Sequence, residues 1–358
     1  MKILMVARRF PPDVLSGTET VFENLWRRAR RRHEVRLVVG YVRRRDMVPA
    51  DAVAVDLRGA PQHVAWARLW MAAFREQRRF APDVVLANSI ETPTLGAPTA
   101  CIVHDLNFGR AERTPGTRAR ELFYAAKSRW LGAIITVSDA TKMRLLELGV
   151  SAEKAHVVRN GVDLDVFCPA PARPRQGGAE DAVAFAYPSR ILPAKGQHLA
   201  LDALARLPKP YKSRARLTIA GASVDPIFVD QLKVQAYEQP AEIRTDVPEI
   251  APIYQDADVI LYPTLMEEGF GFTAIEGMAC GKPVIWTDQP AIREATGGIG
   301  FPIERGDVDA MRATMMKLMD DPELRARVGE EGRRHVERTA SWDAAWEKYE
   351  AVLQGIRR

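Results

Sequence analysis

The chain alternates short apolar runs with longer segments in which apolar residues recur every three or four positions. Short apolar runs predict buried strands, and the longer period predicts amphipathic helices. In the first half, strands are expected at 3–7, 35–40, 52–57, 84–88, 100–104 and 134–138, and helices at 18–32, 63–80 and 118–131. Such alternation is typical of a parallel sheet with helices on both faces.

This pattern is interrupted once and then repeats. Residues 168–181, CPAPARPRQGGAED, combine proline, glycine and charge without an apolar period, which predicts a linker. Strands are expected again at 182–187, 217–220, 259–262 and 283–286, and helices at 274–280, 323–336 and 342–356. We therefore predict an α/β protein with two Rossmann-like, doubly wound domains, 1–167 and 182–341. A ligand crevice is expected at the carboxyl ends of the strands, in the gap between the domains.

Length and composition narrow the class of protein. A chain of 358 residues suits two domains. The three cysteines are far apart and form no CxxC pair, which favours a reducing compartment over a disulfide framework or a structural zinc site. The sequence contains no apolar run long enough to cross a membrane, and the short apolar start predicts a strand rather than a signal peptide. We expect a cytoplasmic protein.

The net charge of +5 is concentrated in the first domain. One group of arginines lies within 27–45, and a second shares a segment with aromatic residues: Arg68, Arg75, Arg78 and Arg79 with Trp66, Trp70 and Phe74. These groups can be solvated helix faces, or a basic surface that rests on the inner face of an anionic membrane or meets an anionic acceptor. Nucleic acid is not an expected partner, since the sequence has no recognisable nucleic-acid module.

The strongest chemical signal is a glycine-rich turn between two glutamates eight residues apart, EGFGFTAIE at 268–276. Glycines let the backbone approach a ligand, and the amides that begin the following helix would face an anion such as a diphosphate. Glu268 would lie in the loop at the height of a bound sugar. Glu276 would lie inside the helix, where it can accept hydrogen bonds from ribose hydroxyls. The alternative interpretation is an ordinary turn with two solvated glutamates.

Two other loops could hold phosphate. Arg190 and Lys195 follow strand 182–187; the arginine can bind a phosphate bidentately, and the lysine can act as a point charge. In the first domain, a proline-rich loop ends in Ser-Gly-Thr at a helix start that includes Gly17. This loop lacks the GxGxxG spacing, and the chain has no GxxxxGK[ST] motif, which disfavours nicotinamide-binding and P-loop enzymes.

A histidine and two aspartate pairs complete the candidates. His104, followed by Asp105, stands at the end of strand 100–104, where its imidazole can donate a hydrogen bond to a sugar hydroxyl. Asp256-Ala257-Asp258 and Asp307-Val308-Asp309 have the spelling of a metal-binding motif. The former lies before a strand, the wrong end for a ligand, and the latter follows Gly306 with the pattern of a helix cap. No metal site is expected.

These motifs closely resemble the retaining glycosyltransferases of family four, which have the two-domain GT-B fold. The matching segments stand in the family's order: Ser16-Gly17, His104-Asp105, Thr136-Val137-Ser138, Asn160-Gly161-Val162-Asp163, Arg190 with Lys195-Gly196, Glu268 to Glu276, and Ala279-Cys280-Gly281-Lys282-Pro283-Val284. The chain departs from the family at Ser16 and Ser189, where glycine is usual.

The resemblance implies a metal-independent transferase that retains the anomeric configuration of a nucleotide-diphosphate sugar, by front-face attack and without a further cofactor. Arg190 and Lys195 would bind the diphosphate, Glu276 the ribose, and Glu268 and His104 the donor sugar. Backbone groups would contact sugar or phosphate at Gly17, Gly269, Phe270, Gly271, Phe272 and Thr273. The last helix, within 342–358, would pack back on the first domain.

Similarity around His104-Asp105-Leu106 is greatest to mannosyl- and rhamnosyl-transferring members that build cell-surface polysaccharide. This favours GDP-mannose or a related deoxy sugar, with UDP-sugars as the alternative donor. The acceptor would be a hydroxyl of a glycan, glycolipid or small molecule. Two other functions stay open. A sugar-nucleotide epimerase or isomerase would need an acid–base pair that we do not find, and a catalytically inactive sugar-nucleotide-binding protein is opposed by the intact site residues.

Overall fold

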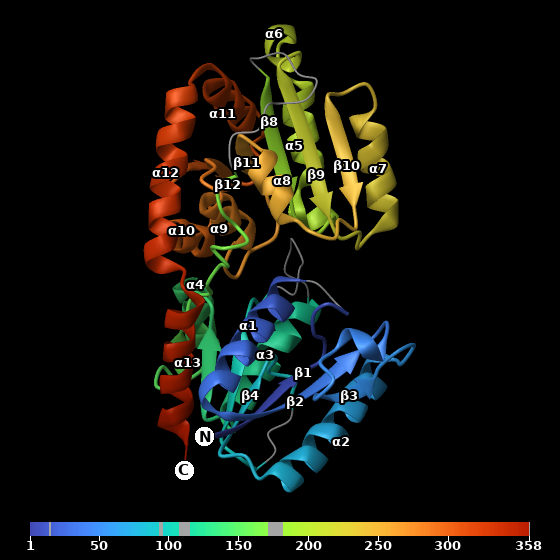
Figure 1. Cartoon of the computed structure of the whole chain (residues 1–358), viewed down its shortest axis with the longest axis vertical. Helices are drawn as coiled ribbons and strands as arrows, with labels where there is room; N and C mark the ends of the chain where they lie inside the picture. Colours follow the sequence, from blue (N-terminus) through green and yellow to red (C-terminus); the bar gives the residue numbers. More distant parts are fainter. Residues whose placement is uncertain (14–15, 93–95, 107–114, 171–181, 358) are drawn as a thin grey trace. The chain divides into compact units, whose positions relative to one another are not determined.

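The computed structural model describes residues 1–13, 16–92, 96–106, 115–170 and 182–357. Its contacts divide the chain into two compact units. Unit 1 comprises the described residues of 1–106, 115–161 and 342–357, and unit 2 comprises those of 162–341. Most of the predicted linker, 171–181, and two residues of the first loop, 14–15, lie outside the described residues. Each unit is built on a parallel sheet (Figure 1).

Unit 1 has a seven-stranded sheet in the order β3-β2-β1-β4-β5-β6-β7. Its strands are β1 (Lys2–Ala7), β2 (Glu34–Tyr41), β3 (Val53–Asp56), β4 (Val84–Ala87), β5 (Thr99–Val103), β6 (Ala133–Thr136) and β7 (Ala155–Val157). Its helices are α1 (Gly17–Arg32), α2 (Gln62–Phe80), α3 (Pro115–Ser128), α4 (Asp139–Glu147) and α13 (Trp342–Ile356), with a 3₁₀ turn η1 (Arg45–Met47). Helix α13 packs on α1 and on strands β4, β5 and β6.

Unit 2 has a six-stranded sheet in the order β10-β9-β8-β11-β12-β13. Its strands are β8 (Val183–Pro188), β9 (Ala215–Gly221), β10 (Ala241–Thr245), β11 (Val259–Tyr262), β12 (Val284–Thr287) and β13 (Phe301–Ile303). Its helices are α5 (Gln197–Ala205), α6 (Lys209–Lys212), α7 (Pro226–Ala236), α8 (Ala251–Asp256), α9 (Phe272–Ala279), α10 (Pro290–Thr296), α11 (Val308–Asp320) and α12 (Pro322–Thr339), with a 3₁₀ turn η2 (Pro193–Lys195).

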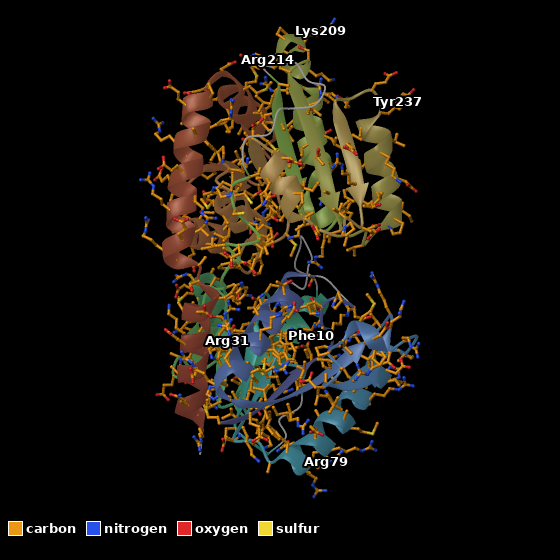
Figure 2. The ribbon with its side chains drawn as sticks, viewed as in Figure 1. Phe10, Arg31, Arg79, Lys209, Arg214 and Tyr237 are labelled. Atoms are coloured by element: carbon orange, nitrogen blue, oxygen red, sulfur yellow. The ribbon has the colours of Figure 1, made fainter. Side chains whose placement is uncertain are left out.

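The central strands are apolar because helices cover both faces of a doubly wound sheet. Every residue of β4, β6, β11 and β12 is buried. The helices supply the rest of the core through one face each; Leu69 and Ala73 of α2, for example, are fully buried against β1 and β2. Side chains fill the interior beside the sheets as well: Phe10, labelled in Figure 2, is 1% exposed and packs edge-on against Trp26 at 5.6 Å.

The predicted fold class, two Rossmann-like parallel-sheet domains, is confirmed. Several boundaries differ from the prediction. Strands β4 and β5 end one residue early, which leaves Asn88 and His104 just beyond the sheet. The predicted helix 118–131 begins at Pro115 and ends at Ser128, because Leu131 closes a tight turn onto the Ser128 carbonyl. Within the described residues, no helix combines the length and apolar character needed to cross a bilayer.

Candidate active site

The predicted site residues of unit 2 lie where its strand order reverses. Strands β8 and β11 are neighbours in the sheet, and the chain runs outward from them to β10 on one side and β13 on the other. In doubly wound sheets, such a reversal opens a crevice at the carboxyl ends of the two strands. The loop after β8 carries Arg190 and Lys195, and the loop after β11 carries Glu268.

A buried ion pair joins these two loops. Lys195 Nζ lies 2.6 Å from Glu268 Oε1, and the two side chains are only 10% and 9% exposed. Thr264 Oγ1 donates to the same carboxylate oxygen at 2.7 Å. Burial raises the pKa of Glu268, but the charge and hydrogen bond of Lys195, together with the Thr264 hydroxyl, outweigh it and hold that pKa below its usual value. Glu268 is therefore ionised at neutral pH.

Backbone and amide contacts fix the position of this pair. The amides of Leu265 and Met266 both donate to the Ala194 carbonyl at 2.9 Å, so the loop after β11 is hydrogen-bonded to η2. The Glu268 amide donates to Gln289 Oε1 at 3.0 Å, and Gln289 Nε2 donates to the Met266 carbonyl at 2.8 Å. The carboxylate thus has little freedom to turn away from the crevice.

Gly196 lets the first loop approach the second. Its φ is +74°, and a Cβ placed on it would lie 2.2 Å from the Pro263 carbonyl oxygen. Only glycine accepts this conformation and this close approach without strain. The Lys195–Glu268 pair therefore depends on a residue that has no side chain.

The second glutamate lies in helix α9. Gly271, with φ of +105°, precedes the helix, and its carbonyl accepts from the amides of Ala274 and Ile275. Helix geometry leaves earlier amides such as that of Thr273 without an intrahelical acceptor, and they suit an anion. Glu276 Oε2 accepts from the Tyr254 hydroxyl at 2.5 Å. Burial raises the pKa of Glu276 to about 7, despite the opposing effect of this hydrogen bond.

Arg190 and Lys195 differ in their surroundings. Arg190 is exposed, and its carbonyl accepts from Gln197 Nε2 at 2.8 Å. Lys195 is 8% exposed and is bound to Glu268. The sequence predicts both cations on a diphosphate. In this structure Arg190 is exposed, and Lys195 neutralises the Glu268 carboxylate. Their roles toward a ligand stay predictions.

In unit 1, the corresponding reversal lies between β1 and β4. His104 follows β5, and its Nε2 lies 2.8 Å from Asn88 Oδ1, the first residue after β4. Asn88 Nδ2 donates in turn to the Thr18 carbonyl in α1 at 3.3 Å. Burial lowers the pKa of His104 to about 4, so the imidazole is neutral at physiological pH.

The helix predicted at 18–32 begins one residue earlier, at Gly17, and its first turn has a carboxylate of its own. Glu19 is 8% exposed and accepts hydrogen bonds from the Ser16 and Thr18 hydroxyls, the latter at 2.6 Å. A phosphate at this helix start would lie near that carboxylate, which opposes its binding. The contact expected at Gly17 stays a prediction.

The two aspartate pairs have structural partners. Asp258 Oδ2 accepts from the Ala184 amide at 2.7 Å, at the amino end of β11. Asp307 caps α11, as predicted, by accepting from the Ala310 amide at 2.8 Å. Across the described ranges, no group of three or more histidine, cysteine or acidic side chains is arranged to hold a metal ion.

Sequence reasoning missed the residues that position the two glutamates: Thr264, Gln289 and Tyr254. Asn88 could have been found, because it ends a predicted strand at the same edge of the sheet as His104. Nothing in the local sequence around Tyr254 or Gln289 indicates a partner that lies 22 or 21 residues away.

Two family models match the chain. Residues 15–166 match the model described as Glycosyltransferase Family 4, and residues 171–335 match the model described as Glycosyl transferases group 1. The chain belongs to glycosyltransferase family four. Family membership agrees with the two-sheet architecture, which is the GT-B fold, and makes the protein a glycosyltransferase.

Relatives within the family include two mannosyltransferases. The MMP alpha-(1->4)-mannosyltransferase of Mycolicibacterium hassiacum is 27% identical, over 80% of this chain and 76% of the relative. The GDP-mannose-dependent monoacylated alpha-(1-6)-phosphatidylinositol monomannoside mannosyltransferase of Corynebacterium glutamicum is 30% identical, over 56% of each chain. The crystal structure of HepE from Anabaena, in complex with UDP and glucose, superposes with a TM-score of 0.79 at 18% identity, over 99% of this chain and 100% of that one.

Proposed function

We propose that this glycosyltransferase transfers a hexosyl residue from a nucleotide-diphosphate sugar to a hydroxyl of a glycan, glycolipid or small-molecule acceptor, with retention of the anomeric configuration and without a metal ion. A mannosyl donor, as GDP-mannose, is favoured over a UDP-sugar because the names of two relatives specify mannosyl transfer and one specifies GDP-mannose.

The observation that carries this proposal is the arrangement at the strand reversal of unit 2. An ionised glutamate, a buried lysine and the amino end of α9 lie on the loops after two adjacent strands. A departing nucleoside diphosphate gains negative charge in the transition state. Lys195, Arg190 and the backbone amides at the amino end of α9 would stabilise that charge electrostatically, in place of a metal ion.

Each glutamate then has a separate task. Glu268, held by Lys195 and Thr264, would accept hydrogen bonds from donor-sugar hydroxyls. Glu276 would accept from the ribose, and the two donated hydrogen bonds would favour its ionised form. His104 is neutral and donates its single N–H, on Nε2, to Asn88 Oδ1. Its other ring nitrogen would therefore accept a hydrogen bond from a donor-sugar hydroxyl rather than donate one.

The stereochemical claim is tested by proton NMR of the first product formed. GDP-mannose and UDP-glucose are each mixed with the enzyme in chelator-treated buffer, with water, monosaccharides and a glycolipid as acceptors. We expect one donor to be consumed and the new anomeric signal to keep the α configuration of the donor. A β product would refute retention, and dependence on an added divalent ion would refute metal independence. A new sugar nucleotide formed without an acceptor would identify an epimerase instead.

A further inference from the structure

Helix α2 has an exposed face that does not contribute to the core of unit 1. Its inner face enters the core through Leu69, Ala73 and Phe80. Its outer face exposes three large apolar side chains within two turns: Trp70 at 41%, Met71 at 53% and Phe74 at 47%. Single exposed apolar residues are common on protein surfaces, but a contiguous group marks an interaction site.

The same outer face has an uncompensated positive charge. It carries the exposed arginines Arg68, Arg75, Arg78 and Arg79. None of these four forms an ion pair with the part of the chain that the structure describes. The acidic residue of the helix, Glu76, is 8% exposed and pairs with Arg36 of β2 at 3.6 Å.

The arginines at the end of α1 differ from those of α2, because they are paired with acidic residues. The last turn of α1 carries Arg30, Arg31 and Arg32, and each has an acidic partner: Asp51 at 3.1 Å, Asp343 at 3.1 Å and Glu350 at 3.9 Å, respectively. On α2, by contrast, the Arg78 guanidinium lies beside an aromatic ring, 5.1 Å from the centre of Phe74.

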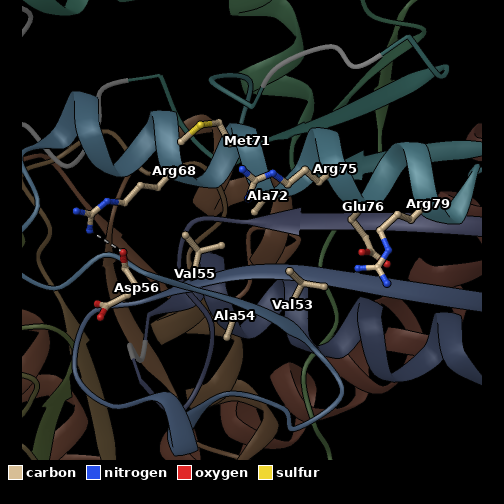
Figure 3. A pocket seen from close by; sticks show the side chains of 10 residues that line it. All are labelled: Val53, Ala54, Val55, Asp56, Arg68, Met71, Ala72, Arg75, Glu76 and Arg79. Carbon is tan, nitrogen blue, oxygen red and sulfur yellow. Dashed lines mark hydrogen bonds between the residues drawn. The ribbon is translucent and has the colours of Figure 1, made fainter.

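A groove of about 440 Å³ continues this face toward the edge strand β3. Its lining combines the strand residues Val53, Ala54, Val55 and Asp56 with the α2 residues Arg68, Met71, Ala72, Arg75, Glu76 and Arg79. The two acidic residues of this lining are each paired with an arginine outside it, Asp56 with Arg58 and Glu76 with Arg36. Figure 3 shows Arg68 reaching from α2 toward β3, where it donates to the Asp56 carbonyl at 3.0 Å. Cationic groups therefore stand beside apolar side chains in one open site.

We propose that the outer face of α2 with this groove, which we call the α2 face, docks on the surface of an anionic phospholipid bilayer. Aromatic and aliphatic side chains of an amphipathic helix insert at the level of the headgroups, while flanking arginines bind lipid phosphates. The absence of an exposed carboxylate on the described helix α2 removes the repulsion that an acidic residue would cause. The groove would take a lipid phosphate between its arginines.

Vesicle flotation of the full-length protein tests the charge component. The vesicles contain phosphatidylcholine alone, or equal parts of phosphatidylcholine and phosphatidylglycerol. The variant R75Q/R78Q/R79Q is compared with R30Q/R31Q/R32Q, which loses the same charge from paired arginines. Because each arginine near an anionic surface strengthens binding about fivefold, the first variant should partition roughly a hundredfold more weakly than the wild type, and the second much as the wild type does.

A second variant separates a membrane from any other polyanion. W70S/F74S keeps all four arginines, so it should still bind heparin at low salt but lose most of its binding to anionic vesicles. Both side chains are exposed, so the fold should persist; circular dichroism checks this, and M71S replaces the variant if it fails. The proposal would be overturned if the wild-type protein did not float with anionic vesicles. Equal vesicle binding by both arginine variants, or vesicle binding unaffected by W70S/F74S, would overturn it too. None of these results depends on the donor.

Discussion

Replacing Lys195 by methionine leaves the Glu268 carboxylate buried without its cation. The two side chains are about one-tenth exposed and 2.6 Å apart. Removing one partner of such a pair costs about 3–5 kcal/mol of folding free energy, because the remaining charge loses its compensation. In a unit of this size, each kcal/mol lowers the melting temperature by about 2–4 °C, so Lys195→Met should lower it by roughly 10 °C.

The double variant distinguishes this cause from simple loss of packing. Glu268→Gln alone leaves a buried ammonium and should cost a similar amount. The double variant has no buried charge, so its cost should fall short of the sum of the two single costs by at least about 2 kcal/mol. The free energies of unfolding are measured by urea titration monitored by circular dichroism, with one transition fitted for each of the two units. Additive costs within about 0.5 kcal/mol would refute a direct interaction.

The cost of Lys195→Met should also depend on pH in a definite direction. Without the lysine, burial raises the pKa of Glu268, so the folded variant takes up a proton that the unfolded chain releases. The variant should therefore recover stability relative to the wild type as the pH falls from about 8 to 5. A penalty that stays constant over this range would mean that the carboxylate is not the cause.

Three further variants test other parts of the site. Because Glu276 has a folded pKa of about 7, its proton contributes stability below pH 4.5 that is lost as the pH rises through 7; Glu276→Gln should be more stable than the wild type at pH 8, by at most about 3 kcal/mol, and equal to it near pH 4.5, by thermal unfolding. The Cε1 proton of His104 should show no NMR titration between pH 5.5 and 8, whereas Asn88→Asp should raise the pKa of His104 and bring a titration into this range; a wild-type titration near 6.5 would be contrary evidence. Gly196→Ala should lower the melting temperature of unit 2 clearly more than Gly306→Ala does, because Gly306 also has a positive φ, +81°, but has open space around its Cβ position. Equal melting temperatures of the two variants would show that the close approach of Gly196 to Pro263 is not important for stability.

Much of the fold was predictable because the local sequence shows the spacing of apolar residues that is typical of strands and helices. The central strands, such as β11, are buried on every residue and appear as uninterrupted apolar runs. The prediction missed β7 and β13, which have three residues each and are too short to show a period. It also missed β10, an edge strand whose sequence, AEIRT, is mostly polar.

The candidate site was predictable only as far as loop position allowed. Arg190, Lys195 and Glu268 follow strands whose carboxyl ends meet, so their grouping follows from topology. The direct bond between Lys195 and Glu268 joins residues 73 positions apart, and it depends on the tight turn at Gly196. Such contacts arise from the register of neighbouring loops, which no local pattern records.

The central claim is that these loops of unit 2 bind the sugar nucleotide. Isothermal titration of GDP-mannose and UDP-glucose into the wild type, Glu268→Gln and the matched control Glu267→Gln tests it most directly, since Glu267 is the exposed neighbour of the buried acid. We predict that the wild type and Glu267→Gln bind one donor with the same affinity and that Glu268→Gln binds it at least tenfold more weakly. Equal binding by all three proteins would contradict the account.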